Sequence, residues 1–63
     1  MKNVLQKSIF SVDDRDFNNA LENFNKMVRE GWADGFLIAT DSLRVEITNH
    51  AIVIAAIMEK DTE

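Results

Sequence analysis

Residues 51–58 read Ala-Ile-Val-Ile-Ala-Ala-Ile-Met, an unbroken apolar run near the end of a 63-residue chain. Successive side chains of a β-strand point to opposite faces, so this run predicts a strand that is apolar on both sides. One helix can cover only one of these sides, and the other side then needs a second protein surface. We therefore expect a homo-oligomer or a binding module, with an interface that includes Ile52, Val53, Ile54 and Ile57.

The size and composition of the chain favour the same conclusion. A single domain over residues 1–63, with a charged tail at 59–63 that is expected to fray, buries too small a fraction of its surface to be very stable alone. The sequence has no Cys and one His, which excludes disulfides and argues against a structural zinc site. Self-association is the means of stabilisation that remains.

Charge and hydropathy bear on partners and location. Seven basic and eleven acidic residues give a net charge of −4, which opposes general binding to nucleic acid or to an anionic membrane. The apolar run is much shorter than the roughly 20 residues that cross a bilayer, and no basic segment followed by an apolar one opens the chain. We expect a cytoplasmic protein with no membrane partner.

The first half of the chain predicts a strand followed by a helix. Residues 4–12 alternate apolar and polar side chains imperfectly, as in a half-buried strand. Ser11 is followed three residues later by an acid, so the helix is expected to begin near Asp14. Apolar side chains then recur at spacings of three and four and form one face of that helix: Phe17, Ala20, Leu21, Phe24, Met27 and Val28.

The end of this helix is predicted from a glycine. Gly31 stands where a left-handed residue would terminate the helix, which then runs from Asp14 to Glu30. Trp32 is expected to pack back over the last turn. On this prediction Phe17, Leu21 and Phe24 are buried against a sheet.

The second half of the chain predicts strands. Asp41-Ser42 is either a turn between two strands or a bulge within one strand over residues 36–48. The fold class is α+β, in the order β-α-β-β with a further strand if Asp41-Ser42 is a turn, and one amphipathic helix packs on a small, mainly antiparallel sheet. The runs rich in apolar and β-branched residues are 36–39, 43–47 and 51–58.

Three segments carry a resemblance to known families: Asp16–Phe24, the motif Glu30-Gly31-Trp32 and the apolar run 51–58. With Asp16–Phe24 and the run 51–58 the chain resembles small sporulation-associated or phage-encoded βαββ proteins of Gram-positive bacteria, whose function is unknown. With Glu30-Gly31-Trp32 it resembles another small domain of unknown function, in which a helix ends in this motif before a strand. The resemblance implies the fold and a phage or mobile-element setting, in which a small accessory protein modulates or inhibits a host protein. It brings no catalytic residues, and the stretch 41–49 departs from the pattern of these families.

The sequence offers no set of residues typical of a catalytic or metal site. Asp13, Asp14 and Asp16 are explained by helix capping better than by a bound cation. His50 lies in an expected turn, and no Ser, Cys or acid falls at a spacing that marks a nucleophile system. We expect a protein that is not an enzyme and that uses no cofactor and no metal.

Trp32, Arg44 and His50 are the residues we single out as contacts for a ligand or a partner. Trp is enriched at the energetic centres of protein interfaces, and Arg binds anions through a planar fork of N–H groups. We expect a non-enzymatic homo-oligomeric protein that binds another protein. The alternative is a protein that binds or sequesters a small anionic ligand, such as a nucleotide, in a site between protomers to which each copy contributes Arg44.

Overall fold

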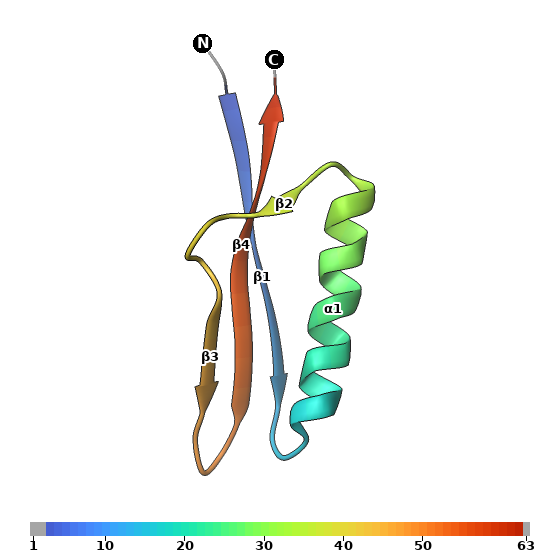
Figure 1. Ribbon diagram of the computed structural model, residues 1–63. Coiled ribbons are helices and arrows are strands. Elements are labelled where there is room, and N and C mark those ends of the chain that lie inside the picture. Colours follow the sequence, from blue (N-terminus) through green and yellow to red (C-terminus); the bar gives the residue numbers. More distant parts are fainter. Residues whose placement is uncertain (1–2, 63) are drawn as a thin grey trace.

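The computed structural model describes residues 3–62 and consists of one helix on one face of an antiparallel sheet (Figure 1). The expected α+β class and the single helix packed on an antiparallel sheet are confirmed. In chain order, the elements are β1 (Asn3–Asp13), α1 (Phe17–Ala33), β2 (Leu37–Ile38), β3 (Arg44–Ile47) and β4 (Ile52–Thr62).

β4 is the central strand of the sheet. It pairs with β1 on one side and with β2 and β3 on the other side, and each pairing is antiparallel. Pairing with β1 is continuous and places Asn3 opposite Thr62. Residues 59–62, part of the tail expected to fray, are therefore strand, because they pair with the first residues of β1; Glu63 lies outside the described residues.

Asp41-Ser42 belongs to a bulge that interrupts one edge of the sheet. β2 and β3 both pair with β4 along the same edge instead of pairing with each other. From Ile38 to Arg44 the edge advances by six residues, whereas their partners in β4 are only three residues apart. The extra residues leave the ladder, and Asp41 adopts a positive φ of 63° there. The structure combines the two alternatives open in the sequence. β2 and β3 are separate strands with a turn between them, in which the N–H of Ser42 donates to the carbonyl of Ala39 at 3.2 Å. The turn does not reverse the chain, however, and its extra residues form a bulge on one edge of the sheet.

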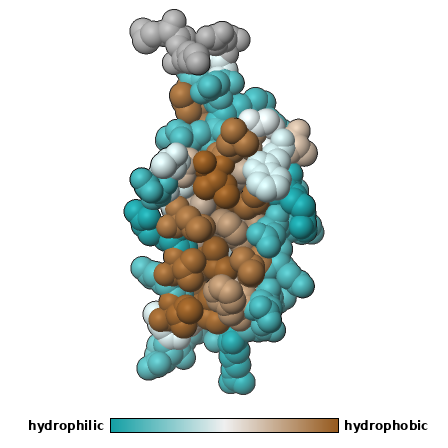
Figure 2. All heavy atoms as spheres, in the orientation of Figure 1, coloured by the Kyte–Doolittle hydropathy of each residue, from teal (hydrophilic) through white to brown (hydrophobic). Residues whose placement is uncertain are grey.

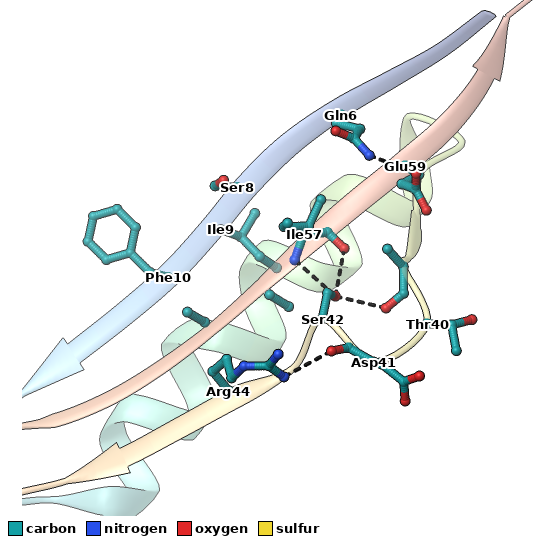
Figure 3. A pocket seen from close by; sticks show the side chains of 13 residues that line it. Gln6, Ser8, Ile9, Phe10, Thr40, Asp41, Ser42, Arg44, Ile57 and Glu59 are labelled. Atoms are coloured by element: carbon teal, nitrogen blue, oxygen red, sulfur yellow. Dashed lines mark hydrogen bonds between the residues drawn. The ribbon is translucent and has the colours of Figure 1, made fainter.

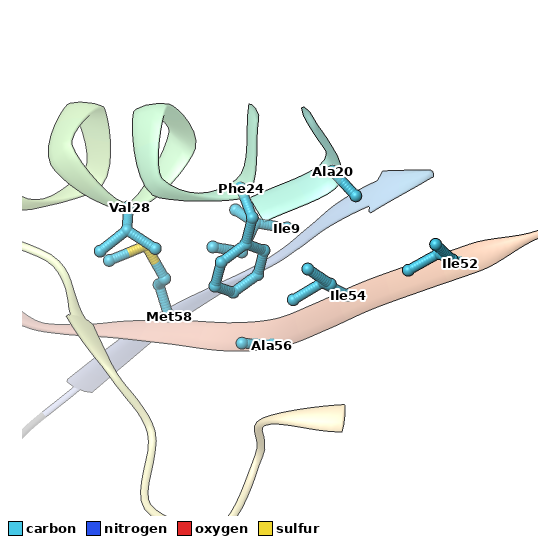
Figure 4. Close-up of a cluster of buried hydrophobic side chains, with 8 residues drawn as sticks. All are labelled: Ile9, Ala20, Phe24, Val28, Ile52, Ile54, Ala56 and Met58. Atoms are coloured by element: carbon cyan, nitrogen blue, oxygen red, sulfur yellow. The ribbon is translucent and has the colours of Figure 1, made fainter. Parts of the chain in front are cut away.

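The core lies between α1 and the side of the sheet that faces it (Figure 4). The even-numbered side chains of β4 point to this side, so α1 covers one apolar face of the run 51–58. Met58 is fully buried, with none of its surface exposed. The buried apolar residues are Ile9 of β1, Ala20, Phe24 and Val28 of α1, and Ile52, Ile54, Ala56 and Met58 of β4.

The position of α1 over the sheet corrects part of the predicted core. α1 contacts β1, β4 and β2 but does not reach β3. Only three residues connect β1 to α1, so the helix runs back beside the strand that it follows. Phe17 and Leu21, expected to be buried, lie on the flank turned away from β1 and are 40% and 36% exposed.

α1 begins later than the sequence predicts. Asp16 is the N-cap, and its carboxylate accepts a hydrogen bond from the backbone N–H of Asn19 at 3.2 Å. Ser11, expected near the cap, lies in β1 and is buried beneath the helix. The continuous pairing of β1 with β4 carries the strand as far as Asp13, which moves the helix start to Phe17.

Gly35, not Gly31, ends α1. Gly35 has a φ of +88°, and the N–H groups of Gly35 and Phe36 donate to the carbonyls of Trp32 and Gly31 at 3.0 and 2.9 Å. These two bonds form a Schellman motif with Gly35 in the left-handed position. The predicted end at Glu30 is therefore wrong.

Gly31 is a helix-interior residue with a packing role. It is buried, and a Cβ atom at this position would meet Met58, at 2.7 Å from Cε and closer still to Sδ. The missing side chain lets α1 approach the sheet where Met58 fills the core. The sequence alone left two glycines as candidate helix ends, and tertiary packing assigns them different roles.

Candidate interaction surfaces

The first candidate surface is the side of the sheet opposite α1, which we call the open face. Within residues 3–62 no helix covers it (Figure 1). Opposed residues of two strands share a face, so Val12 and Val53 lie together there, and so do Phe10 and Ala55. Phe10 is 62% exposed, although it is a large aromatic side chain. The apolar strand residues of the open face are Val4, Phe10, Val12, Leu37, Val53, Ala55 and Ile57.

A shallow hollow of about 660 Å³ lies on the open face beside the bulge (Figure 3). Phe10 and Ile57 line it on the apolar side, while Asp41, Arg44 and Glu59 contribute charged groups. Two carboxylates and one guanidinium thus surround a partly apolar floor. This composition suits a protein surface with a polar rim.

Ser42 completes the sheet where the bulge interrupts it. Its hydroxyl accepts a hydrogen bond from the N–H of Ile57 at 3.1 Å and donates to the carbonyl of Ala39 at 2.8 Å. The N–H of Ala39 in turn donates to the carbonyl of Ile57 at 2.8 Å. One side chain therefore satisfies the backbone that the bulge would leave unpaired, and it holds the rim of the hollow in place.

The second candidate surface is an apolar band on the helix side of the sheet, between α1 and β3. Val45 and Ile47 are opposite Ile54 and Ile52, so they point to the helix side, but α1 does not reach them. Ile47 is 68% exposed. Figure 2 shows an area of apolar atoms that extends over β3 and the near flank of α1. We call this surface the helix-side band; its exposed members are Phe17, Leu21, Ile38, Val45 and Ile47.

The structure divides the predicted interface residues into two groups. Val53 and Ile57 lie on the open face, where the prediction of an interface stands for both. Ile52 and Ile54 are 8% and 2% exposed because α1 packs on them. We therefore correct the assignment of these two residues from an interface to the core of a single chain.

Trp32, Arg44 and His50, the predicted partner contacts, lie in three separate places. Trp32 is 55% exposed near the end of α1 and does not pack tightly over its last turn. Arg44 lines the hollow on the open face, and its Nη1 donates to the carbonyls of Asp41 and Leu43 at 2.9 and 3.0 Å. His50 is exposed in the connection from β3 to β4. The three do not form one site.

Some surface residues escaped the sequence prediction. Phe10 and Val12 have the same parity in residues 4–12, so the sequence pattern places them on one face of the strand. The strand register that sets them beside Val53 cannot be read from the sequence. Val45 and Ile47 lie on an expected strand. Their exposure follows only from the distance between β3 and α1.

Asp13 is the titratable group whose pKa is most clearly shifted by its surroundings. Its carboxylate accepts hydrogen bonds from the backbone N–H groups of Arg15 and Asp16 at 2.9 and 2.8 Å, and from Asn19 Nδ2 at 2.6 Å. These donors favour the ionised form and lower the pKa of Asp13 from 3.8 to about 2. The network holds the turn between β1 and α1 and points to no chemical reaction.

In the described part of the chain, no three His, Asp or Glu residues are grouped so that they could hold a metal ion. Among residues 3–62 there is also no helix with the length and apolarity that a membrane span requires. Comparisons with protein-family models, curated proteins and solved structures found no match to this chain. The two apolar surfaces are therefore the features of this chain that bear on its function.

Proposed function

We propose that this protein is a non-enzymatic, homo-oligomeric binding protein that recognises another protein. The observation that carries the proposal is the exposure of apolar side chains on both sides of one thin sheet, the open face and the helix-side band. Contiguous exposed apolar surface on a small protein is typical of interaction sites. Two such surfaces allow one contact with a second copy and another contact with a partner.

The shapes of the two surfaces suggest how these roles are divided. The open face is the surface of a regular β1–β4 ladder, and such a surface packs well against an equivalent sheet at about 10 Å. A two-fold axis would then place Val53 and Ile57 against the same residues of the second copy. The helix-side band lies between a helix and a strand, a shape that accepts an apolar segment of a different protein.

The resemblance to phage-encoded and sporulation-associated proteins supports one further part of the proposal. In that setting the partner is a host protein that this chain modulates or inhibits. A small anionic ligand is the less favoured occupant, because Asp41 and Glu59 line the same hollow as Arg44 and would repel it. Capture of a host protein by the wild-type chain, and its loss in Ile47→Asp, would support this part.

The self-association is tested by placing a charge on the open face. Ile57→Asp is expected to lower the molar mass measured by light scattering at micromolar concentration, while circular dichroism shows a folded chain. Asn25→Asp is the matched control, since it adds the same charge on an exposed position of α1. A wild-type chain that is monomeric at high micromolar concentration would overturn the proposed oligomer.

A further inference from the structure

The two edges of the sheet differ in how well they are protected from pairing with another strand. The β2–β3 edge is short and is broken by the bulge at Asp41-Ser42. The β1 edge is one uninterrupted strand from Asn3 to Asp13 with no Pro. Bulges, charges and prolines are the usual means of blocking an edge, and between Val4 and Val12 only Lys7 is charged.

Hydrogen bonds on the far side of β4 show which backbone groups of β1 are unpaired. Both backbone polar groups of a strand residue point to the same neighbouring strand, and the direction alternates along the chain. Ile57 directs its N–H and carbonyl at Ser42 and Ala39, away from β1. The even-numbered residues of β4 therefore bond to β1, and their partners there are odd-numbered. The residues left with outward N–H and carbonyl groups are Val4, Gln6, Ser8, Phe10 and Val12.

The chain exposes more surface than a compact monomer of its size. Its accessible surface is 4892 Å², against about 4,100 Å² expected for a folded monomer of this mass. The radius of gyration of 13.0 Å also exceeds the roughly 11 Å expected for a compact chain of this length.

We propose that β1 pairs antiparallel with β1 of a second copy across a two-fold axis at Ser8, which joins the two sheets into one. This register sets Ser8 opposite Ser8, Gln6 opposite Phe10 and Val4 opposite Val12, so every outward backbone group between Val4 and Val12 finds a partner.

Two neighbouring registers are less favourable. A shift that sets Lys7 opposite Lys7 opposes like charges and pairs fewer outward residues. A shift that sets Ile9 opposite Ile9 avoids the repulsion but leaves Val4 without a partner. In the register centred on Ser8, Lys7 lies opposite Ile9, and no like charges meet.

The surroundings of the β1 edge leave room for this contact. A shallow depression of about 520 Å³ runs along the edge between β1 and α1. Phe10 and Val12 form its strand side, and α1 contributes Lys26 and Glu30. A two-fold axis brings the same helix flank of the second copy alongside, and the presence of both charges permits Lys26 to face Glu30 across the axis.

This contact is distinct from packing of the open face. Edge pairing extends the sheet within its own plane, whereas packing of the open face stacks a second layer on top of that plane. Both contacts can therefore exist in one assembly. The chain has no Cys, and a single introduced Cys therefore reports on one position.

The decisive experiment is disulfide crosslinking in the full chain. In a hydrogen-bonded antiparallel pair the Cα atoms are about 5.5 Å apart, within the range of a disulfide. Ser8→Cys is expected to give a covalent dimer as the main product of mild oxidation. Gln6→Cys and Phe10→Cys alone are expected to give little dimer, because equivalent residues would lie about 13 Å apart along the strands. An equal mixture of the last two variants should crosslink.

Equal crosslinking of all three single variants, or none with Ser8→Cys, would overturn the inference. The Ser8→Cys crosslink is expected to persist when Ile57→Asp is added, which separates failure of edge pairing from failure of the proposed open-face contact.

A proline gives an independent test. Ser8 is exposed and its N–H points outward, so Ser8→Pro removes no bond to β4, and it should leave the chain folded while lowering its mass by a factor of about two. Ile9→Pro removes a bond to β4 and should unfold the chain. A folded Ser8→Pro variant with wild-type mass would contradict the edge pairing.

Discussion

The two faces of β4 are built from similar side chains and have opposite surroundings. Ile52 and Ile54 are buried under α1, while Val53 and Ile57, odd-numbered residues of the same strand, lie on a face with no helix over it. Hydrophobicity does not distinguish the two sets. The difference arises because the short β1–α1 connection returns the helix over only one side of the sheet. Residue type makes a side chain eligible for burial, and topology decides which one is buried by its own chain.

The largest test of this comparison exchanges two phenylalanines for alanine. Phe24 is 4% exposed in the core and Phe10 is 62% exposed on the open face. Phe24→Ala is expected to cost about 3–5 kcal/mol in the free energy of unfolding, measured by urea denaturation, because it leaves a cavity. Phe10→Ala should cost under about 1 kcal/mol in dilute solution, where the chain is dissociated, and should weaken self-association. Equal losses of stability in the two variants would contradict the assignment of one face to the core and of the other to the exposed surface.

The second test concerns the close approach that closes the buried face. Gly31→Ala places a methyl group against the side chain of Met58, which is fully buried. We expect a loss of about 1–3 kcal/mol from overpacking, although Ala is the better helix former. Thermal unfolding followed by circular dichroism measures the loss.

Met58→Val in the Gly31→Ala background provides the control for this mechanism. If the clash with Met58 is the cause, the shorter side chain should recover part of the stability, and the double variant should be more stable than the sum of the two changes predicts. A Gly31→Ala variant more stable than wild type would contradict the packing role of Gly31.

The smallest effect on stability is expected from a change in the turn between β1 and α1, which places α1 over one face of the sheet. The pKa of Asp13 is lowered to about 2 in the folded chain from an ordinary 3.8, so its ionised form contributes stability above pH 3.8. That contribution is lost as the pH falls through about 2, because both states then bind the proton. Asp13→Asn should therefore show a weaker loss of stability between pH 4 and pH 2, measured by urea denaturation at each pH.

Asp14→Asn is the matched control for this pH dependence. Asp14 is the neighbouring carboxylate, and it takes no part in the hydrogen bonds that Asp13 accepts. The control variant should follow the wild-type curve. If Asp13→Asn also follows it, the turn does not depend on the ionised carboxylate.

Several features of the fold could be predicted from the sequence. The apolar run 51–58 predicted a strand that is covered on one side by a helix, and the spacing of Phe24 and Val28 predicted the buried stripe of that helix. Both follow from regular periodicities, which depend on local backbone geometry alone. The α+β class followed from the same patterns.

The sequence predicted the candidate interaction surfaces only in part. Alternation predicted that both faces of the strand are apolar and placed Val53 and Ile57 at an interface, but it placed Ile52 and Ile54, which are core residues, at the same interface. Nothing local distinguishes the two sets, because either face would satisfy the pattern. The helix-side band could not be predicted at all, since it exists only because α1 lies over β1 and β4 and stops short of β3.

The sequence by itself determined that one strand is apolar on both faces and that one helix carries a single apolar stripe, because strand alternation and helical spacing are properties of the local chain. The tertiary structure decided the rest. Packing against Met58 made Gly31 a helix-interior residue and left the left-handed end to Gly35. Pairing of β2 and β3 with one strand made Asp41-Ser42 a bulge, and the hydroxyl of Ser42 became a partner for Ile57. These outcomes depend on contacts between residues far apart in the chain, which no local pattern encodes.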